Sequence, residues 1–163
     1  MSQNSATAAT TVSRVAGAIA GLGPVYSLVE NEFLAVNRLI ADQLASDVAM
    51  VEDIGSYIVE SGGKRLRPLM VLLTSQALGY AGDQHIKLAT IIEFLHTATL
   101  LHDDVVDESE KRRGRPSANL LWDNKSSVLV GDYLFSRSFQ LMVETGSLQV
   151  LNILANASAT IAE

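Results

Sequence analysis

The chain has 163 residues, a length within the range of a single domain. Of these, 48% are hydrophobic, mainly Ala, Leu, Val and Ile, and 6% are aromatic, a composition that favours packed helices and excludes wholesale disorder. The net charge of −6 argues against a nucleic-acid partner, because phosphate binding needs an excess of clustered Lys and Arg. The lack of cysteine excludes disulfides, a thiolate nucleophile and Cys-ligated zinc.

The N-terminal segment matches neither the pattern of a membrane span nor that of a secretory signal. No uncharged apolar run reaches the roughly 18–20 residues that a transmembrane helix needs, and the nearest candidate, Val15–Val29, is interrupted by Pro24. Residues 1–13 lack the basic start of a secretory signal. We therefore expect residues 1–24 to form a flexible arm, residues 25–163 to belong to a single domain, and the protein to be cytoplasmic.

Hydrophobic spacing predicts three helices in the first half of the chain. Apolar residues recur every three or four positions over residues 29–44, and again over residues 48–58 after a short break. The pair Gly62-Gly63 is expected to end the second helix. Pro68 suits the first turn of a third helix that stops at Gly79, because proline lacks the N–H that is unpaired there anyway.

The second half continues the helical pattern and has no sustained strand alternation. Residues 85–107 contain no Pro or Gly and are apolar around most of the circumference, as in a central, buried helix. Residues 108–116 are expected to form a loop. Ser126 or Ser127 could cap a further helix that ends at Gly146, and a last helical pattern follows. The sequence therefore predicts an all-α fold.

The long helical pattern ends in a cluster of carboxylates. At 100° per residue, Asp103 and Asp107 lie about one turn apart on nearly the same line, with Asp104 to the side. His96 and Thr99 fall on the same stripe. Carboxylate oxygens with few histidines suit a hard cation such as Mg²⁺, which keeps several waters and shares its ligands with substrate phosphates.

Basic side chains flank this cluster in the sequence. Arg112 and Arg113 follow the carboxylates, and Lys64, Arg65 and Arg67 stand beside the glycine pair. Arginine forks bind phosphate oxygens in pairs, and lysine adds a point charge. Acids that hold Mg²⁺ and bases that hold phosphate together predict a site for a diphosphate.

Four motifs resemble those of the trans-isoprenyl diphosphate synthases, most closely the long-chain, octaprenyl-type enzymes. They occur in the order and approximate spacing of that family, and the resemblance covers the chain from about Val25 to its end. The motifs are GGKRLRP (Gly62–Pro68), EFLHTATLLHDDVVDES (Glu93–Ser109), RRGRPSAN (Arg112–Asn119) and GDYLFSRSF (Gly131–Phe139).

The resemblance implies a helical bundle with a deep cavity, in which an allylic diphosphate is elongated head to tail with isopentenyl diphosphate. By the family pattern, Asp103 and Asp107 bind Mg²⁺ and Asp104 assists them. Arg112 matches a residue that holds the allylic diphosphate. The positions that bind isopentenyl diphosphate are matched by Lys64, Arg67, His96 and Arg113.

The family pattern also implies a long product. Bulky residues shortly before the aspartates stop elongation early in the family, whereas this chain has Ala98 and Thr99 there. By analogy with the family we expect a polyprenyl diphosphate of about forty carbons that serves quinone side chains. A homodimer, and a peripheral membrane contact for product release, are implied as well.

The sequence departs from the family in one respect. A second aspartate-rich motif on a later helix, with basic residues near it, has no counterpart, and the only acids after Phe139 are Glu144 and Glu163. We therefore expect the N-terminal half of such an enzyme, inactive by itself, with apolar helix faces left uncovered.

Three alternatives stay open from the sequence. One is a metal-dependent phosphohydrolase with a histidine–aspartate cluster of His96, His102, Asp103 and Asp132, which leaves GGKRLRP without a role. Another is a non-catalytic subunit of a heteromeric prenyl synthase, although such subunits tend to lose the first aspartate motif. The third is a terpene cyclase, which has no obvious use for the isopentenyl-binding residues.

Overall fold

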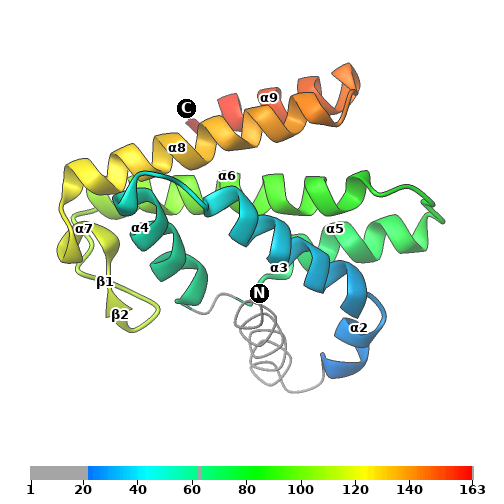
Figure 1. The fold of residues 1–163 in the computed structure, drawn as a ribbon, viewed down its shortest axis with the longest axis horizontal. Helices are drawn as coiled ribbons and strands as arrows, with labels where there is room; N and C mark the ends of the chain where they lie inside the picture. Colours follow the sequence, from blue (N-terminus) through cyan, green and yellow to red (C-terminus); the bar gives the residue numbers. More distant parts are fainter. Residues whose placement is uncertain (1–21, 62–63, 163) are drawn as a thin grey trace. The chain divides into compact units, whose positions relative to one another are not determined.

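The computed structural model describes residues 22–61 and 64–162 (Figure 1). The predicted all-α fold is confirmed: the regular structure of the described residues consists of helices and one hairpin, whose two strands have two residues each. The helices are α2 (Gly23–Ser27), α3 (Glu30–Leu44), α4 (Ala49–Glu60), α5 (Leu66–Ala77), α6 (Gln84–Val106), α7 (Ala118–Leu121), α8 (Asn124–Glu144) and α9 (Leu148–Ala162), and the strands are β1 (Lys111–Arg112) and β2 (Arg115–Pro116). Most of the expected N-terminal arm and the pair Gly62-Gly63 lie outside the described residues.

The chain divides inside α6 into two compact units, one up to Thr90 and one from Ile91. In the first unit, α3 packs against both α4 and α5. A spacing of three and four residues brings the apolar side chains of α3 to one face, where they are buried: Phe33, Val36, Ile40 and Leu44. Tyr26 of α2 packs edge-on against Phe33, with 5.3 Å between the ring centroids.

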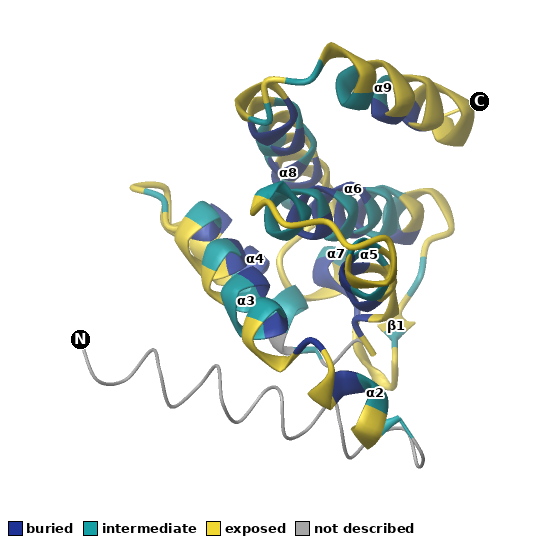
Figure 2. Cartoon of the chain, turned by 90° about the vertical axis from the view of Figure 1, so that its right-hand side faces the viewer, coloured by how far each residue is buried: buried dark blue, intermediate teal, exposed yellow. Residues whose placement is uncertain are grey.

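In the second unit, α8 is the central helix and contacts α7 and α9. The end of α6 runs beside α8, and the buried hydroxyl of Ser127 donates to the carbonyl of Leu101 at 3.0 Å (Figure 1). At this crossing a Cβ on Gly131 would collide with the imidazole of His102, so glycine allows the close approach. Figure 2 shows that most of α9 is exposed, with its buried residues on one side only.

Short elements and one helix start differ from the sequence-based predictions. α8 begins at Asn124 and is capped by Asp123, whose carboxylate accepts a hydrogen bond from the backbone N–H of Ser126 at 2.6 Å, so Ser126 and Ser127 are not the cap. The predicted loop over residues 108–116 contains the hairpin, and α2 and α7 were not predicted. Elements this short cannot display a helical or strand period.

None of the helices in the described part of the chain combines the length and apolar character that spanning a bilayer requires.

Candidate active site

The carboxylate cluster lies at the C-terminal end of α6. Asp107 follows the last residue of the helix, and its backbone N–H donates to the carbonyl of Asp103 at 2.8 Å, so the two residues keep helical register. Both are exposed, whereas Asp104 is only 3% exposed. Asp103 and Asp107 therefore present their carboxylates to solvent, and Asp104 is directed into the protein.

The helix ends in a tight reversal of the chain. Glu108 is in the left-handed region, with φ of 50°. The backbone N–H of Ser109 donates to the carbonyl of Asp104 at 2.9 Å, and that of Glu108 donates to Val105 at 3.3 Å. These two bonds define a Schellman motif, which usually places glycine where Glu108 stands. The reversal sends the following residues back along the end of α6.

A hairpin then returns an arginine to the helix end. Arg113 and Gly114 have φ of 53° and 79°, which suits a two-residue turn of the type that joins twisted antiparallel strands. Arg112 pairs with Arg115 across the turn. The exposed side chain of Arg113 stands at the hairpin tip.

Arg112 forms a bidentate pair with Asp104. Its Nε donates to Oδ2 and its Nη2 donates to Oδ1, both at 2.8 Å, and the side chains are 32% and 4% exposed. The hydrogen bonds to Asp104 raise the pKa of Arg112 despite its partial burial, and the negative charges of Asp104, Asp103 and Asp107 act in the same direction. The guanidinium is thus held, charged, beside the two exposed carboxylates.

Two polar residues of the motif RRGRPSAN, neither of which was predicted as a site residue, hold this arrangement in place. The buried Ser117 donates through its hydroxyl to the carbonyl of Ser109, and its backbone N–H donates to Glu110 at 3.0 Å. Asn119 donates through Nδ2 to the carbonyl of Asp104 at 3.3 Å. These bonds span 8 and 15 positions of the sequence and depend on the reversal of the chain, so no local pattern marked the two residues.

Further back along α6, the other predicted residues occupy different environments. His96 and Thr99 are half-buried, and the Thr99 hydroxyl donates to the carbonyl of His96 at 2.8 Å. Ala98 is fully buried. Ala98, one of the two small residues expected to allow a long product, is therefore part of the packed interior.

The remaining basic residues belong to the first unit. Lys64 and Arg67 are exposed on either side of Arg65, which precedes α5 in the left-handed conformation, with φ of 47°. Arg65 itself is 5% exposed, and its Nη2 donates to the carbonyl of Val59 at 3.5 Å. The side chains of Lys64 and Arg67 are thus free to face solvent while the residue between them is fixed in the interior.

The histidine–aspartate cluster of the phosphohydrolase hypothesis is not assembled. His102 Nε2 lies 3.4 Å from Asp132 Oδ1 and 3.3 Å from the carbonyl of Val128, so it turns toward α8. Across residues 22–61 and 64–162, no three His, Asp or Glu side chains are placed to hold a metal ion together. Two exposed carboxylates, Asp103 and Asp107, instead fit a hard cation that completes its shell with water and phosphate oxygens.

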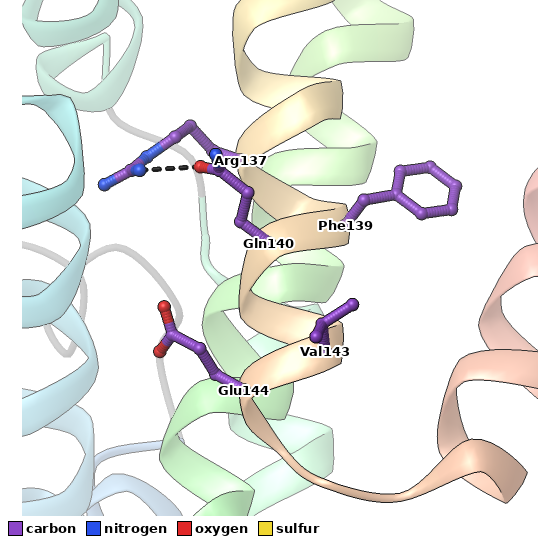
Figure 3. A pocket seen from close by; sticks show the side chains of 5 residues that line it. All are labelled: Arg137, Phe139, Gln140, Val143 and Glu144. Carbon is purple, nitrogen blue, oxygen red and sulfur yellow. Dashed lines mark hydrogen bonds between the residues drawn. The ribbon is translucent and has the colours of Figure 1, made fainter.

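An open hollow of about 490 Å³ lies along the C-terminal half of α8. Figure 3 shows Arg137 and Gln140 joined by a hydrogen bond of 2.6 Å, with Phe139 and Val143 pointing to another side of the helix. The lining is completed by Glu144. None of the predicted site residues lines this hollow, so it lies outside the candidate active site.

Residues 48–163 match the model of the polyprenyl synthetase family. The chain belongs to that family. It is 49% identical over 142 residues to the octaprenyl diphosphate synthase of Escherichia coli, covering 87% of this chain and 44% of the relative. None of the named relatives favours the phosphohydrolase, the terpene cyclase or the non-catalytic subunit.

Solved structures agree with this assignment. A decaprenyl diphosphate synthase from Rhodobacter capsulatus is 56% identical, with a TM-score of 0.82 over 86% of this chain and 43% of the other. A polyprenyl synthase from Caulobacter crescentus, complexed with calcium and isoprenyl diphosphate, is 50% identical, with a TM-score of 0.84 over 87% of this chain and 43% of the other. The chain thus spans less than half the length of each of these three relatives.

Proposed function

We propose that the chain is part of a trans-prenyltransferase that elongates an allylic diphosphate with isopentenyl diphosphate. The observation that carries the proposal is the end of α6, where two exposed carboxylates stand beside an arginine fixed by a bidentate pair. A cation and a diphosphate match this combination of charges, and the Caulobacter crescentus relative is complexed with calcium and isoprenyl diphosphate.

The acidic and basic residues have different proposed roles. Asp103 and Asp107 would hold Mg²⁺, and the chemistry that it would supply when bound is neutralisation of negative charge on the leaving diphosphate. Asp104 was expected to assist with Mg²⁺; because both of its oxygens accept from the guanidinium of Arg112, we assign its assistance to orienting that arginine. Arg112 keeps Nη1 outside this pair and offers it to the allylic diphosphate. By the family pattern, we assign Lys64, Arg67, His96 and Arg113 to isopentenyl diphosphate.

The reaction needs little from the protein beyond binding, charge and exclusion of water. Cleavage of the allylic C–O bond leaves a carbocation and a diphosphate, whose developing charge Arg112 stabilises. The double bond of isopentenyl diphosphate attacks the cation, a C–C bond forms, and loss of a proton gives a product one isoprene unit longer. The apolar cavity that the resemblance implies would keep water from quenching the cation.

The finer features stay predictions. Small residues at positions 98 and 99 support a long product, of about forty carbons by family analogy. Use of the product in quinone side chains, assembly as a homodimer, a peripheral membrane contact and a cytoplasmic location belong to the same proposal. So does the expectation that the 163-residue chain is inactive by itself.

Calorimetric titration tests the site in the chain as it stands. The protein is titrated with farnesyl diphosphate in the presence and absence of Mg²⁺. A double variant, Asp103→Asn with Asp107→Asn, should bind at least about tenfold more weakly when Mg²⁺ is present and should lose the effect of Mg²⁺. Asp53→Asn, which neutralises an exposed carboxylate on α4, is the matched control.

An activity assay tests the reaction itself. The chain, and a version extended to the length of its relatives, are incubated with radiolabelled isopentenyl diphosphate, farnesyl diphosphate and Mg²⁺, and the extracted lipids are sized. A ladder of lengthening products from the extended version supports the proposal. Mg²⁺-dependent binding that survives the double substitution, or no product from the extended version, contradicts it.

A further inference from the structure

A hydrogen bond joins α2 to the motif GGKRLRP across 38 positions of the sequence. The hydroxyl of Tyr26 donates to the backbone carbonyl of Lys64 at 2.6 Å. Tyr26 is 3% exposed, and its ring packs edge-on against Phe33 of α3. The hydroxyl is thus aimed by a ring that the core already fixes, and the proposed function leaves it without a role.

The bonded carbonyl belongs to the peptide that precedes a strained residue. Arg65 has φ of 47° and ψ of 36°, a left-handed conformation that residues with a side chain rarely adopt. Such a residue persists where its surroundings determine it. One hydrogen bond of ordinary strength is of the same order as the cost of one left-handed residue, so the bond from Tyr26 is strong enough to maintain this conformation.

The next peptide, between Arg65 and Leu66, starts α5. The carbonyl of Arg65 accepts the first helical bond, from the backbone N–H of Leu69 at 3.1 Å, and Arg67 stands in the first turn. Fixing the peptide between Lys64 and Arg65 therefore sets the direction in which the Lys64 side chain leaves the backbone. It also sets where the first turn of α5, and with it Arg67, begins.

We propose that Tyr26 is a positioning residue for isopentenyl diphosphate, acting through Lys64 and Arg67. The inference rests on the proposed function, which assigns those two basic residues to that substrate. Tyr26 itself does not contact the substrate. Its hydroxyl holds the backbone from which the two phosphate-binding side chains project.

Tyr26→Phe isolates the hydroxyl, because it keeps the ring against Phe33. By calorimetry, we expect the affinity for isopentenyl diphosphate to fall about fivefold, the size of one ordinary hydrogen bond. Farnesyl diphosphate with Mg²⁺ is proposed to bind through Asp103 and Asp107, which are distant from Tyr26 in the sequence. Its affinity should therefore stay within about twofold of the wild-type value. A general loss of structure would lower both affinities, so the ratio between them separates positioning from folding.

A double-mutant cycle tests the route of the effect. In a Lys64→Ala background, Tyr26→Phe should cost much less affinity than in the wild type, because the side chain that it positions is gone. Ser27→Ala is the matched control, since that exposed hydroxyl on the same helix donates only locally, to the carbonyl of Pro24 at 2.7 Å. It should leave both affinities unchanged.

Each outcome decides the inference. Unchanged affinity for isopentenyl diphosphate in Tyr26→Phe, or a loss that adds fully to that of Lys64→Ala, overturns the role of Tyr26 and leaves the proposed function standing. A wild-type chain that binds farnesyl diphosphate but not isopentenyl diphosphate overturns the assignment of Lys64 and Arg67, and the inference with it. If Tyr26→Phe does not fold, the hydroxyl has a structural role and the inference is wrong.

Discussion

Because Asp104 and Arg112 are paired, we expect Asp104→Asn to destabilise the wild-type chain but to stabilise a chain that already carries Arg112→Ala. Asp104→Asn replaces a carboxylate that is 4% exposed and accepts two charge-assisted hydrogen bonds, and we expect the free energy of unfolding to fall by about 2 kcal/mol. Arg112→Ala leaves that carboxylate buried without its partner, which should cost about 3 kcal/mol. Adding Asp104→Asn to Arg112→Ala should then raise stability by about 1 kcal/mol, because it removes an unpaired buried charge.

Urea unfolding of the wild type, both single variants and the double variant measures this cycle. Equal dependence of the unfolding free energy on urea in all four proteins would show that their folded states are comparable. Lys111→Ala, which removes an exposed charge from the same strand as Arg112, is the control and should change stability little. If Asp104→Asn destabilises the chain by the same amount in both backgrounds, the two side chains are not energetically coupled and the pair does not act as described.

Three further predictions concern packing and pH. Gly131→Ala should lower the free energy of unfolding by about 1–3 kcal/mol, because the added methyl overlaps the imidazole of His102. In thermal melts, adding His102→Ala should recover most of this loss. A Gly131→Ala protein as stable as the wild type would contradict the close packing. The hydrogen bond from the backbone N–H of Ser126 lowers the pKa of Asp123 from 3.8, so the cap stabilises the fold above that pH and loses its effect as the pH falls. Asp123→Ala should therefore melt at a lower temperature than the wild type near neutrality and at the same temperature in strong acid. A difference in melting temperature that persists in acid would refute the cap. Burial raises the pKa of Tyr26 from 10.0, so the contribution of the neutral hydroxyl to stability is complete below pH 10.0 and is lost as the pH rises further. The difference in unfolding free energy between the wild type and Tyr26→Phe should therefore shrink in alkali. A difference independent of pH would argue against the burial.

Long helices were accessible from the sequence because periodicity needs several turns to be visible. The predicted helix over residues 85–107 is α6, and the break after residue 44 separates α3 from α4. α2 and α7 have five and four residues, too few to repeat a helical pattern. The cap of α8 was misplaced because Asp123, Ser126 and Ser127 are all residue types that favour that position.

The candidate site was predictable where it depends on one helix and not where it depends on chain reversal. The common line of Asp103 and Asp107 follows from the helical angle alone. The pair between Asp104 and Arg112 depends on the turn at Glu108, and no glycine marks that position in the sequence. Contacts that require a residue in an unusual backbone conformation leave no pattern in composition or spacing.

The end of α6 has an electrostatic consequence for the chain without its cation. The last carbonyls of a helix carry partial negative charge from the aligned peptide dipoles, and Asp103, Asp107 and Glu108 add full negative charges at that point. Arg112 supplies one positive charge here and is paired with Asp104, so the remaining negative charges repel one another until a cation neutralises them. Asp107→Asn should make the cation-free chain melt at a higher temperature while it weakens cation binding, so selection for heat resistance alone would remove the carboxylates on which the proposed catalysis depends.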